Sequence, residues 1–379
     1  MPHAARTAVT VVFFASGASY GSWVARIPAL QDRLDATTSG LGLALFGVAA
    51  GAVVALPLAG WLSARLGSRR VTRMALVAVA LTLPLPGLAP SLVALGLAFA
   101  ALGAAGAMLD LAMNAHGVAV EERYARPILS SFHASFSFGG LAGAIAGGLA
   151  AAAGISPLAQ FTGAAIVIGA IALWSGRTLL SGEVDRVETG PVYGRPSRAL
   201  VALAVLAFAV LLAEGAAADW SGVYLNDTVG TGEGTATVAF IAFSAMMTLG
   251  RLAGDRLTEA WGSVALTRAA GALAVAGLGA ALLVQSVPIV VLGFTCLGAG
   301  LATVVPTVFR AAGARTTSPG AGIAAVSTVG YSAFLVGPPF VGFLADATSL
   351  RLALGVVGAL CALIVVLAGA TAPAPRRTP

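Results

Sequence analysis

Apolar runs of roughly 20 residues, separated by short polar breaks, repeat along the whole chain. A helix needs about 20 mostly apolar residues to cross a bilayer, so the pattern predicts twelve membrane-spanning helices. The predicted spans are 8–30, 40–62, 74–88, 92–118, 128–152, 158–176, 199–223, 236–254, 264–284, 287–309, 321–343 and 351–371. The third span is short because Pro84 and Pro86 interrupt it. The expected fold class is therefore an all-α membrane protein.

A polar stretch at residues 177–198 divides these spans into two sets of six. Such an arrangement is typical of transporters built from two repeated halves. We expect two pseudo-symmetric six-helix bundles, at residues 1–176 and 199–379, joined by a cytoplasmic linker at 177–198. The second bundle ends in a short cytoplasmic tail.

The composition supports lipid as the solvent, because only 9% of residues are charged and 58% are hydrophobic. Soluble domains carry roughly 25% charged residues. Lysine is absent, which excludes a phosphate-binding loop of the GxxxxGK[ST] type. We find no nucleophile–base pair, cofactor loop or metal-ligand spacing, so we expect no enzyme, no metal and no cofactor. The partners expected are the bilayer and a small-molecule substrate, with no nucleic acid, for a monomeric protein.

Arginine placement orients the predicted spans. All 21 basic residues are arginine, and only Arg26, Arg33 and Arg351 fall on the side opposite the N-terminus. Positive residues concentrate on the cytoplasmic side of membrane proteins, so both termini are expected in the cytoplasm. Arginine without lysine suggests GC-rich coding, and we expect a bacterial cytoplasmic (inner) membrane.

Two carboxylates interrupt the apolar runs: Asp110 in the fourth span and Glu214 in the seventh. An ionised carboxylate at the centre of a membrane helix costs at least ~2.5–3.5 kcal/mol on insertion scales. Such residues usually face a bundle interior or a wet cavity, and they mark ion or substrate pathways. The sequence therefore predicts a carboxylate-lined route through the membrane.

Two arginine-rich turns follow the second and eighth spans, GWLSARLGSRRV at 60–71 and GRLAGDRLTEAWG at 250–262. They resemble the signature of the major facilitator superfamily, and the resemblance extends over the whole chain. It implies transport by alternating access. In the second turn, Asp255 and Arg256 match the signature.

In the first turn, Arg65, Arg69 and Arg70 match the same signature, but Ala64 stands where an acid is usual. The resemblance implies that the matching residues latch the cytoplasmic side. An alternative is that these arginines only fix topology.

Two further stretches resemble the fucose–proton symporter branch. Residues 108–117 (MLDLAMNAHG) with 130–148 are similar to its fourth and fifth helices, and 211–225 (LLAEGAAADWSGVYL) is similar to its seventh. The chain also resembles uncharacterised bacterial permeases. The branch resemblance implies proton-coupled movement of a sugar-like solute.

Asp110, Asn114 and His133 are expected at similar depth, because Asn114 lies one helical turn after Asp110 and helical rise places His133 beside them. Our hypothesis is that Asp110, His133 and Glu214 couple transport to protons. Asp110 would carry the proton, His133 would be its hydrogen-bond partner, and Asn114 would hold substrate hydroxyls. Alternatively, the Asp110 pair only locks two helices together.

Asp219 lies five residues after Glu214, about 140° around the helix, so the two are not expected to form one carboxylate pair. Arg26 is predicted to pair with Asp219 or Glu214 and to form an outer gate. Alternatives are an interfacial position for Asp219 and a topological role for Arg26. His116, next to charged residues at the inner end of the fourth span, is expected to be solvated.

Trp23, Phe136 and Tyr331 are candidates for stacking on the cargo, with helix packing as the alternative. Pro306 and the Pro338–Pro339 pair are expected to kink their helices, because proline lacks a backbone donor.

The favoured function is a secondary active transporter that moves a small polar solute by alternating access, with the proton as coupling ion. The alternatives are an exporter of drugs or metabolites by proton antiport, and a membrane receptor or assembly protein that does not transport.

Overall fold

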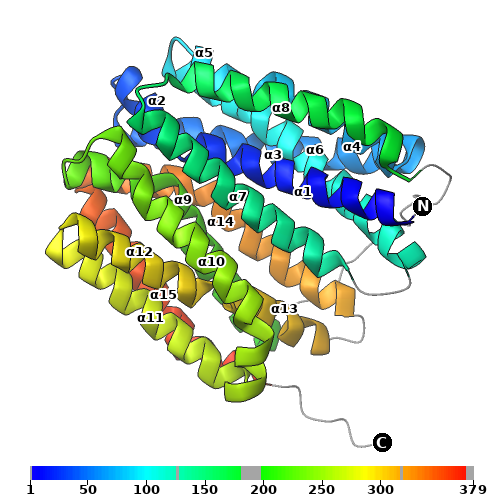
Figure 1. The fold of residues 1–379 in the computed structure, drawn as a ribbon. Coiled ribbons are helices and arrows are strands. Elements are labelled where there is room, and N and C mark those ends of the chain that lie inside the picture. The colour runs from blue at the N-terminus through cyan, green and yellow to red at the C-terminus, as the bar shows by residue number, and fades with distance from the viewer. Residues whose placement is uncertain (1, 125–127, 181–197, 316–318, 373–379) are drawn as a thin grey trace, which may run out of the picture. The chain divides into compact units, whose positions relative to one another are not determined.

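The computed structural model describes residues 2–124, 128–180, 198–315 and 319–372. Throughout these ranges the regular structure is helical, and no strand occurs in them. Twelve helical stretches among the described residues are long and apolar enough to cross a membrane. The all-α fold expected from the hydropathy pattern is confirmed (Figure 1).

The chain forms two compact units, which we describe separately. Unit 1 comprises Met1–Thr189 with Gly232–Thr237, and unit 2 comprises Gly190–Thr231 with Val238–Pro379. The predicted linker lies mostly outside the described residues, as does the tail beyond residue 372.

Unit 1 is formed from the first six predicted spans. Its helices are α1 (Pro2–Val24), α2 (Ile27–Arg33), α3 (Thr38–Leu66), α4 (Ser68–Thr82), α5 (Leu85–Leu88), α6 (Leu92–Tyr124), α7 (Leu129–Ala152) and α8 (Pro157–Thr178).

Unit 2 contains the later spans. Its elements are α9 (Arg198–Val223), a π-helical turn η1 (Tyr224–Thr228), α10 (Glu233–Trp261), α11 (Ser263–Val284), α12 (Val287–Leu301), α13 (Val304–Ala314), α14 (Pro319–Ala347), α15 (Leu350–Leu367) and a 3-10 turn η2 (Ala368–Thr371). The first residues of α10 cluster with unit 1 and the rest of the helix with unit 2.

The third span begins earlier than predicted. The apolar pattern indicates a start at residue 74, whereas the membrane-length stretch runs over Ser68–Leu88. The first turns of α4 carry Arg69, Arg70 and Arg73, which a hydropathy pattern assigns to a loop. Arginine is a good helix former, so the helix starts directly after Gly67.

The same turn occurs in both halves of the chain. Gly67 (φ 80°, ψ 151°) separates α3 from α4, and Gly262 (φ 75°, ψ 155°) separates α10 from α11. A positive φ favours glycine, because a Cβ would be strained there. These glycines lie in the two arginine-rich stretches, residues 60–71 and 250–262, that resemble the same signature. The shared backbone conformation therefore supports an internal repeat.

Close backbone contacts between glycine-bearing helices hold unit 1 together. A Cβ added at Gly17 of α1 would overlap the carbonyl of Phe136 on α7, and one at Gly139 would overlap the carbonyl of Phe14. Gly51 on α3 meets α6 in the same way. Small residues at helix interfaces are typical of membrane proteins, where packing rather than hydrophobicity drives association.

Proline divides the tenth span but not the eleventh. The tenth span consists of α12 and α13, which are separated at Ala302 and Thr303. Pro306 has no N–H to donate to the carbonyl of Ala302, so the helical ladder is interrupted there. Pro338 and Pro339, by contrast, lie inside the continuous helix α14.

Candidate functional site

Asp110 and Asn114 form a polar pair on one face of α6. The Asn114 Nδ2 donates to Asp110 Oδ1 at 3.1 Å and to the Asp110 backbone carbonyl at 2.9 Å. Asp110 is exposed and Asn114 is partly exposed, whereas Leu109, Ala112 and Met113 are buried. The pair therefore points away from the packed side of α6. A carboxylate within a membrane span needs water or a polar partner on its exposed side.

His133 does not act as the predicted partner of Asp110 in this structure. The carboxylate bonds to Asn114 of its own helix instead. The imidazole of His133 is exposed on α7 and lies edge-on to Phe13, with ring centroids 5.4 Å apart. Helical rise predicts the depth of His133 in the membrane but not the direction in which its side chain points. That direction depends on how α7 is rotated about its axis.

Glu214 is paired within unit 2. Its Oε1 lies 3.1 Å from Arg251 Nη2, so α9 and α10 are joined by an ion pair. The side chains are partly exposed, at 23% for Glu214 and 39% for Arg251. Sequence reasoning placed Arg251 among the inner arginines and missed this role. Arg251 lies inside the membrane-length stretch Glu233–Gly254, where an unpaired charge is costly, and this position indicates that it needs an acidic partner.

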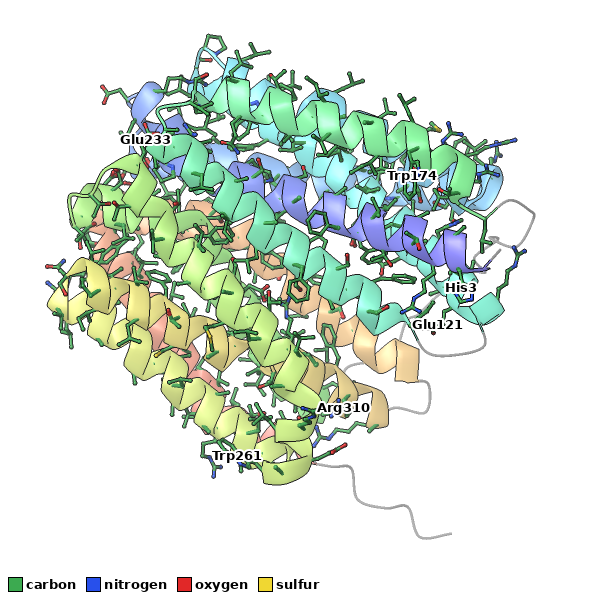
Figure 2. All side chains as sticks on the ribbon, viewed as in Figure 1. His3, Glu121, Trp174, Glu233, Trp261 and Arg310 are labelled. Carbon is green, nitrogen blue, oxygen red and sulfur yellow. The ribbon has the colours of Figure 1, made fainter. Side chains whose placement is uncertain are left out.

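Arg26 is bound by partners within unit 1. Its side chain is 2% exposed. Its guanidinium donates to the carbonyl of Ile155 at 2.9 Å and to Gln160 Oε1 at 3.3 Å, and it lies 3.5 Å from Glu233 Oε2. Figure 2 labels Glu233 at the start of α10. Arg26 thus joins the end of α1 to α8 and to the first turn of α10.

Gln160 connects Arg26 to Ser22 in a polar network that sequence reasoning missed. Besides accepting from Arg26, its Nε2 donates to Ser22 Oγ at 2.7 Å and to the Ser22 carbonyl at 3.2 Å. A lone glutamine in an apolar run is a weak signal, and nothing in its spacing points to Arg26.

Asp219 is partly buried on α9, next to the fully buried Trp220. The indole Nε1 of Trp220 and the hydroxyl of Ser221 are buried without a hydrogen-bond partner. Asp219 therefore lies next to a tightly packed part of α9.

The three candidate stacking aromatics differ in exposure. Trp23 is only 5% exposed and packs against Phe99, with ring centroids 5.2 Å apart. Tyr331 of α14 is 55% exposed and stacks with Phe334 at 6.3 Å. Phe334 in turn lies against Gly215, next to Glu214. Tyr331 therefore belongs to the same region of unit 2 as the Glu214–Arg251 pair.

Phe136 is partly exposed on α7, and Tyr20 is exposed beside Trp23, edge-on to its ring at 5.6 Å. Tyr20 is therefore more exposed than Trp23.

The latch candidates lie at the two arginine-rich turns. The Arg65 guanidinium lies 4.4 Å over the Trp61 ring, within α3. Arg69 is partly buried and Arg70 exposed in the first turn of α4, and Arg256 is exposed on α10. The side chain of Asp255 lies outside the described part of the structure.

His116 is fully buried, which contradicts the expected solvated position. The backbone N–H of Leu180 donates to Nε2 at 3.2 Å, and Nδ1 lies 2.6 Å from Ser68 Oγ. Since Nε2 accepts, the geometry favours the neutral tautomer with its proton on Nδ1. The ring joins α6 to the start of α4 and to the segment after α8.

Among the residues whose placement is described, no group of three metal-ligating side chains could hold a metal ion. Cys361 is buried and Cys296 is partly buried, each as a free thiol.

Comparison with known proteins places this geometry in a family. The sequence matches the Major Facilitator Superfamily over residues 8–333. An uncharacterized transporter of Sinorhizobium fredii is 35% identical, with 95% of this chain and 96% of that protein covered. An uncharacterized MFS-type transporter of Yersinia pestis is 33% identical, with 96% and 94% covered. The membrane protein MosC of Rhizobium meliloti is 33% identical, with 92% and 85% covered.

Solved structures share the fold at low sequence identity. A mutant of the nucleoside transporter NupG superposes with a TM-score of 0.80 and 12% identity, covering 96% of this chain and 99% of that one. A bacterial homolog of the human lysosomal transporter Spinster gives a TM-score of 0.69 with 15% identity, covering 96% and 92%. On the sequence match and these relatives, the chain belongs to the major facilitator superfamily, as a multi-pass membrane transporter.

Proposed function

We propose that this chain moves a small polar, sugar-like solute across the bacterial cytoplasmic membrane by alternating access, in symport with protons. Both termini would lie in the cytoplasm, and the solute would cross unchanged. The family membership supports transport, and the resemblance of the fourth, fifth and seventh spans to the fucose–proton symporter branch supports a sugar-like cargo. The similar fold of NupG, a nucleoside transporter, is consistent with a cargo that contains a sugar.

The Asp110–Asn114 pair carries this proposal. It is a carboxylate inside a membrane-length helix, exposed on one side and bonded on the other to a single neutral amide. Burial favours the protonated form of a carboxyl group, and water or a donor favours the ionised form. A cavity that fills and empties would therefore load and release a proton at Asp110.

Protonation would also change what the pair offers a solute. Ionised Asp110 accepts the Asn114 amide N–H, whereas the protonated acid has an O–H to donate. A cargo hydroxyl could then accept from Asp110 while Asn114 turns its amide to the cargo. Proton and cargo would thus favour the same state of the site, which is the requirement for symport.

The test is accumulation in proteoliposomes under an imposed pH gradient, with labelled sugars and nucleosides as cargo. For one proton per solute, each pH unit supports a concentration ratio of up to about tenfold. We expect the Asp110→Asn protein to exchange cargo between the two sides but to accumulate none. Glu259→Gln, which changes an exposed acid on α10, is the control and should accumulate normally. Full accumulation by the Asp110→Asn protein would exclude Asp110 as the proton carrier.

A further inference from the structure

A small cavity of about 40 Å³ lies in unit 2, against the face of Arg251. Helix α10 contributes Arg251 and Thr258 to its wall, and the broken tenth span contributes Thr303, Thr307 and Arg310. Figure 2 labels Arg310, on α13 beside the last turns of α10. A cavity of this size holds about three water-sized groups, the volume of a carboxylate or a small phosphate group.

The cavity lies where α10 carries a glycine and where the tenth span is broken between α12 and α13. Gly254 of α10 carries no Cβ, and one added there would lie 3.3 Å from Thr303 Cγ2. Pro306 interrupts the ladder between α12 and α13, so the first turn of α13 lines the same cavity. Irregular backbone at membrane depth is tolerated where it lines a cavity.

The groups around the cavity suit an anion. Arg251 and Arg310 both line it, together with the hydroxyl-bearing Thr258, Thr303 and Thr307. Arg251 is 39% exposed although it bonds to Glu214, so its remaining N–H groups are open to a second acceptor. Arginine matches carboxylate and phosphate oxygens through two parallel N–H donors.

We propose that this cavity binds an oxyanion, a carboxylate or a phosphate group, between Arg251 and Arg310, and that Glu214 competes with that anion for Arg251. The group can belong to a soluble anion or to a lipid headgroup, since both present the same oxygens. The site shares no residue with the Asp110–Asn114 pair, so its binding test does not depend on whether Asp110 carries a proton.

The test measures binding to the purified full-length protein at low ionic strength. The probes are inorganic phosphate and the matched pair glucuronate and glucose, which differ by one carboxylate. We expect phosphate and glucuronate, but not glucose, to raise the melting temperature, and salt to weaken the effect. Nanodiscs of phosphatidylglycerol and of phosphatidylcholine form a second arm that detects a headgroup as the occupant.

The variants are expected to act in opposite directions. Arg310→Gln removes a charged donor and should weaken binding at least ~10-fold, while Arg310→Lys should restore part of it. Glu214→Gln removes the competitor of the anion and should tighten binding several-fold, a result that a purely structural ion pair would not give. Arg268→Gln, at an exposed arginine on α11, is the control and should leave binding unchanged.

An effect seen only with phosphatidylglycerol, and lost in Arg310→Gln, would support the site with a lipid as its occupant. The proposal is overturned if the Arg310→Gln protein and the unchanged protein respond equally to the soluble anions and also equally to the phosphatidylglycerol nanodiscs. It is also overturned if Glu214→Gln weakens binding.

Discussion

The guanidinium of Arg26 is almost fully buried, whereas its acidic neighbour Glu233 is 42% exposed. The two side chains therefore contribute unequally to the same contact. Arg26 also satisfies the Ile155 carbonyl and Gln160, which lie in unit 1. A buried charge depends on every one of its partners, and an exposed partner of such a pair contributes little.

We expect Arg26→Gln to cost ~2–4 kcal/mol of stability, because charge-assisted hydrogen bonds are lost and buried acceptors are left unpaired. Glu233→Gln should cost less than ~1 kcal/mol, as is usual for an exposed ion pair. Thermal melting of the purified variants measures the difference. Equal losses would mean that the contact with Glu233, rather than the network around Gln160, holds Arg26.

His116 leads to a second prediction at the residue scale. Replacing it with phenylalanine keeps a ring in the buried position but leaves Leu180 N–H and Ser68 Oγ without this partner. We expect a loss of ~2–4 kcal/mol, since two polar groups would lose a buried partner. Ser68→Ala should cost less, because the Leu180 bond to Nε2 remains. If the His116→Phe protein has the same melting temperature as the unchanged protein, the ring acts only by filling space.

At the scale of elements, helix pairs in unit 1 depend on glycine where backbones touch. Gly139→Ala would place a Cβ into the Phe14 carbonyl and push α7 away from α1. We expect a marked fall in melting temperature or in the yield of folded protein. Gly163→Ala on α8 is the matched control, because no atom lies within 4 Å of an added Cβ there. It should be neutral or slightly stabilising, by up to ~1 kcal/mol, since alanine favours a helix.

The sequence predicted elements better than their contacts. A run of 20 apolar residues and a single carboxylate inside it are local signals, so the span count and Asp110 and Glu214 could be found directly. The start of α4 was missed because Arg69 and Arg70 look like a loop to a hydropathy pattern. The Glu214–Arg251 and Arg26–Gln160 contacts depend on how each helix is rotated against its neighbour. Sequence spacing does not contain that rotation, and for the same reason His116 was expected in water.

At the scale of the whole molecule, alternating access requires that the two membrane carboxylate positions meet water from each side in turn. Single cysteines at positions 110 and 214 report this directly, in a protein whose native Cys296 and Cys361 are replaced by alanine. A membrane-impermeant maleimide is added from one side and then from the other. Ala112→Cys is the negative control, because Ala112 is fully buried beside Asp110.

We expect position 110 to react from both sides, and cargo should raise the rate from one side while it lowers the rate from the other. A transporter that binds cargo more tightly in one state must shift its population toward that state, so one rate rises as the other falls. Reaction from one side only, under every condition, would favour a receptor over a transporter, because a single open face can bind a solute but cannot release it across the membrane. The Asp110→Asn transport assay and this labelling therefore separate two claims: whether the route opens to both sides, and whether a proton controls its opening.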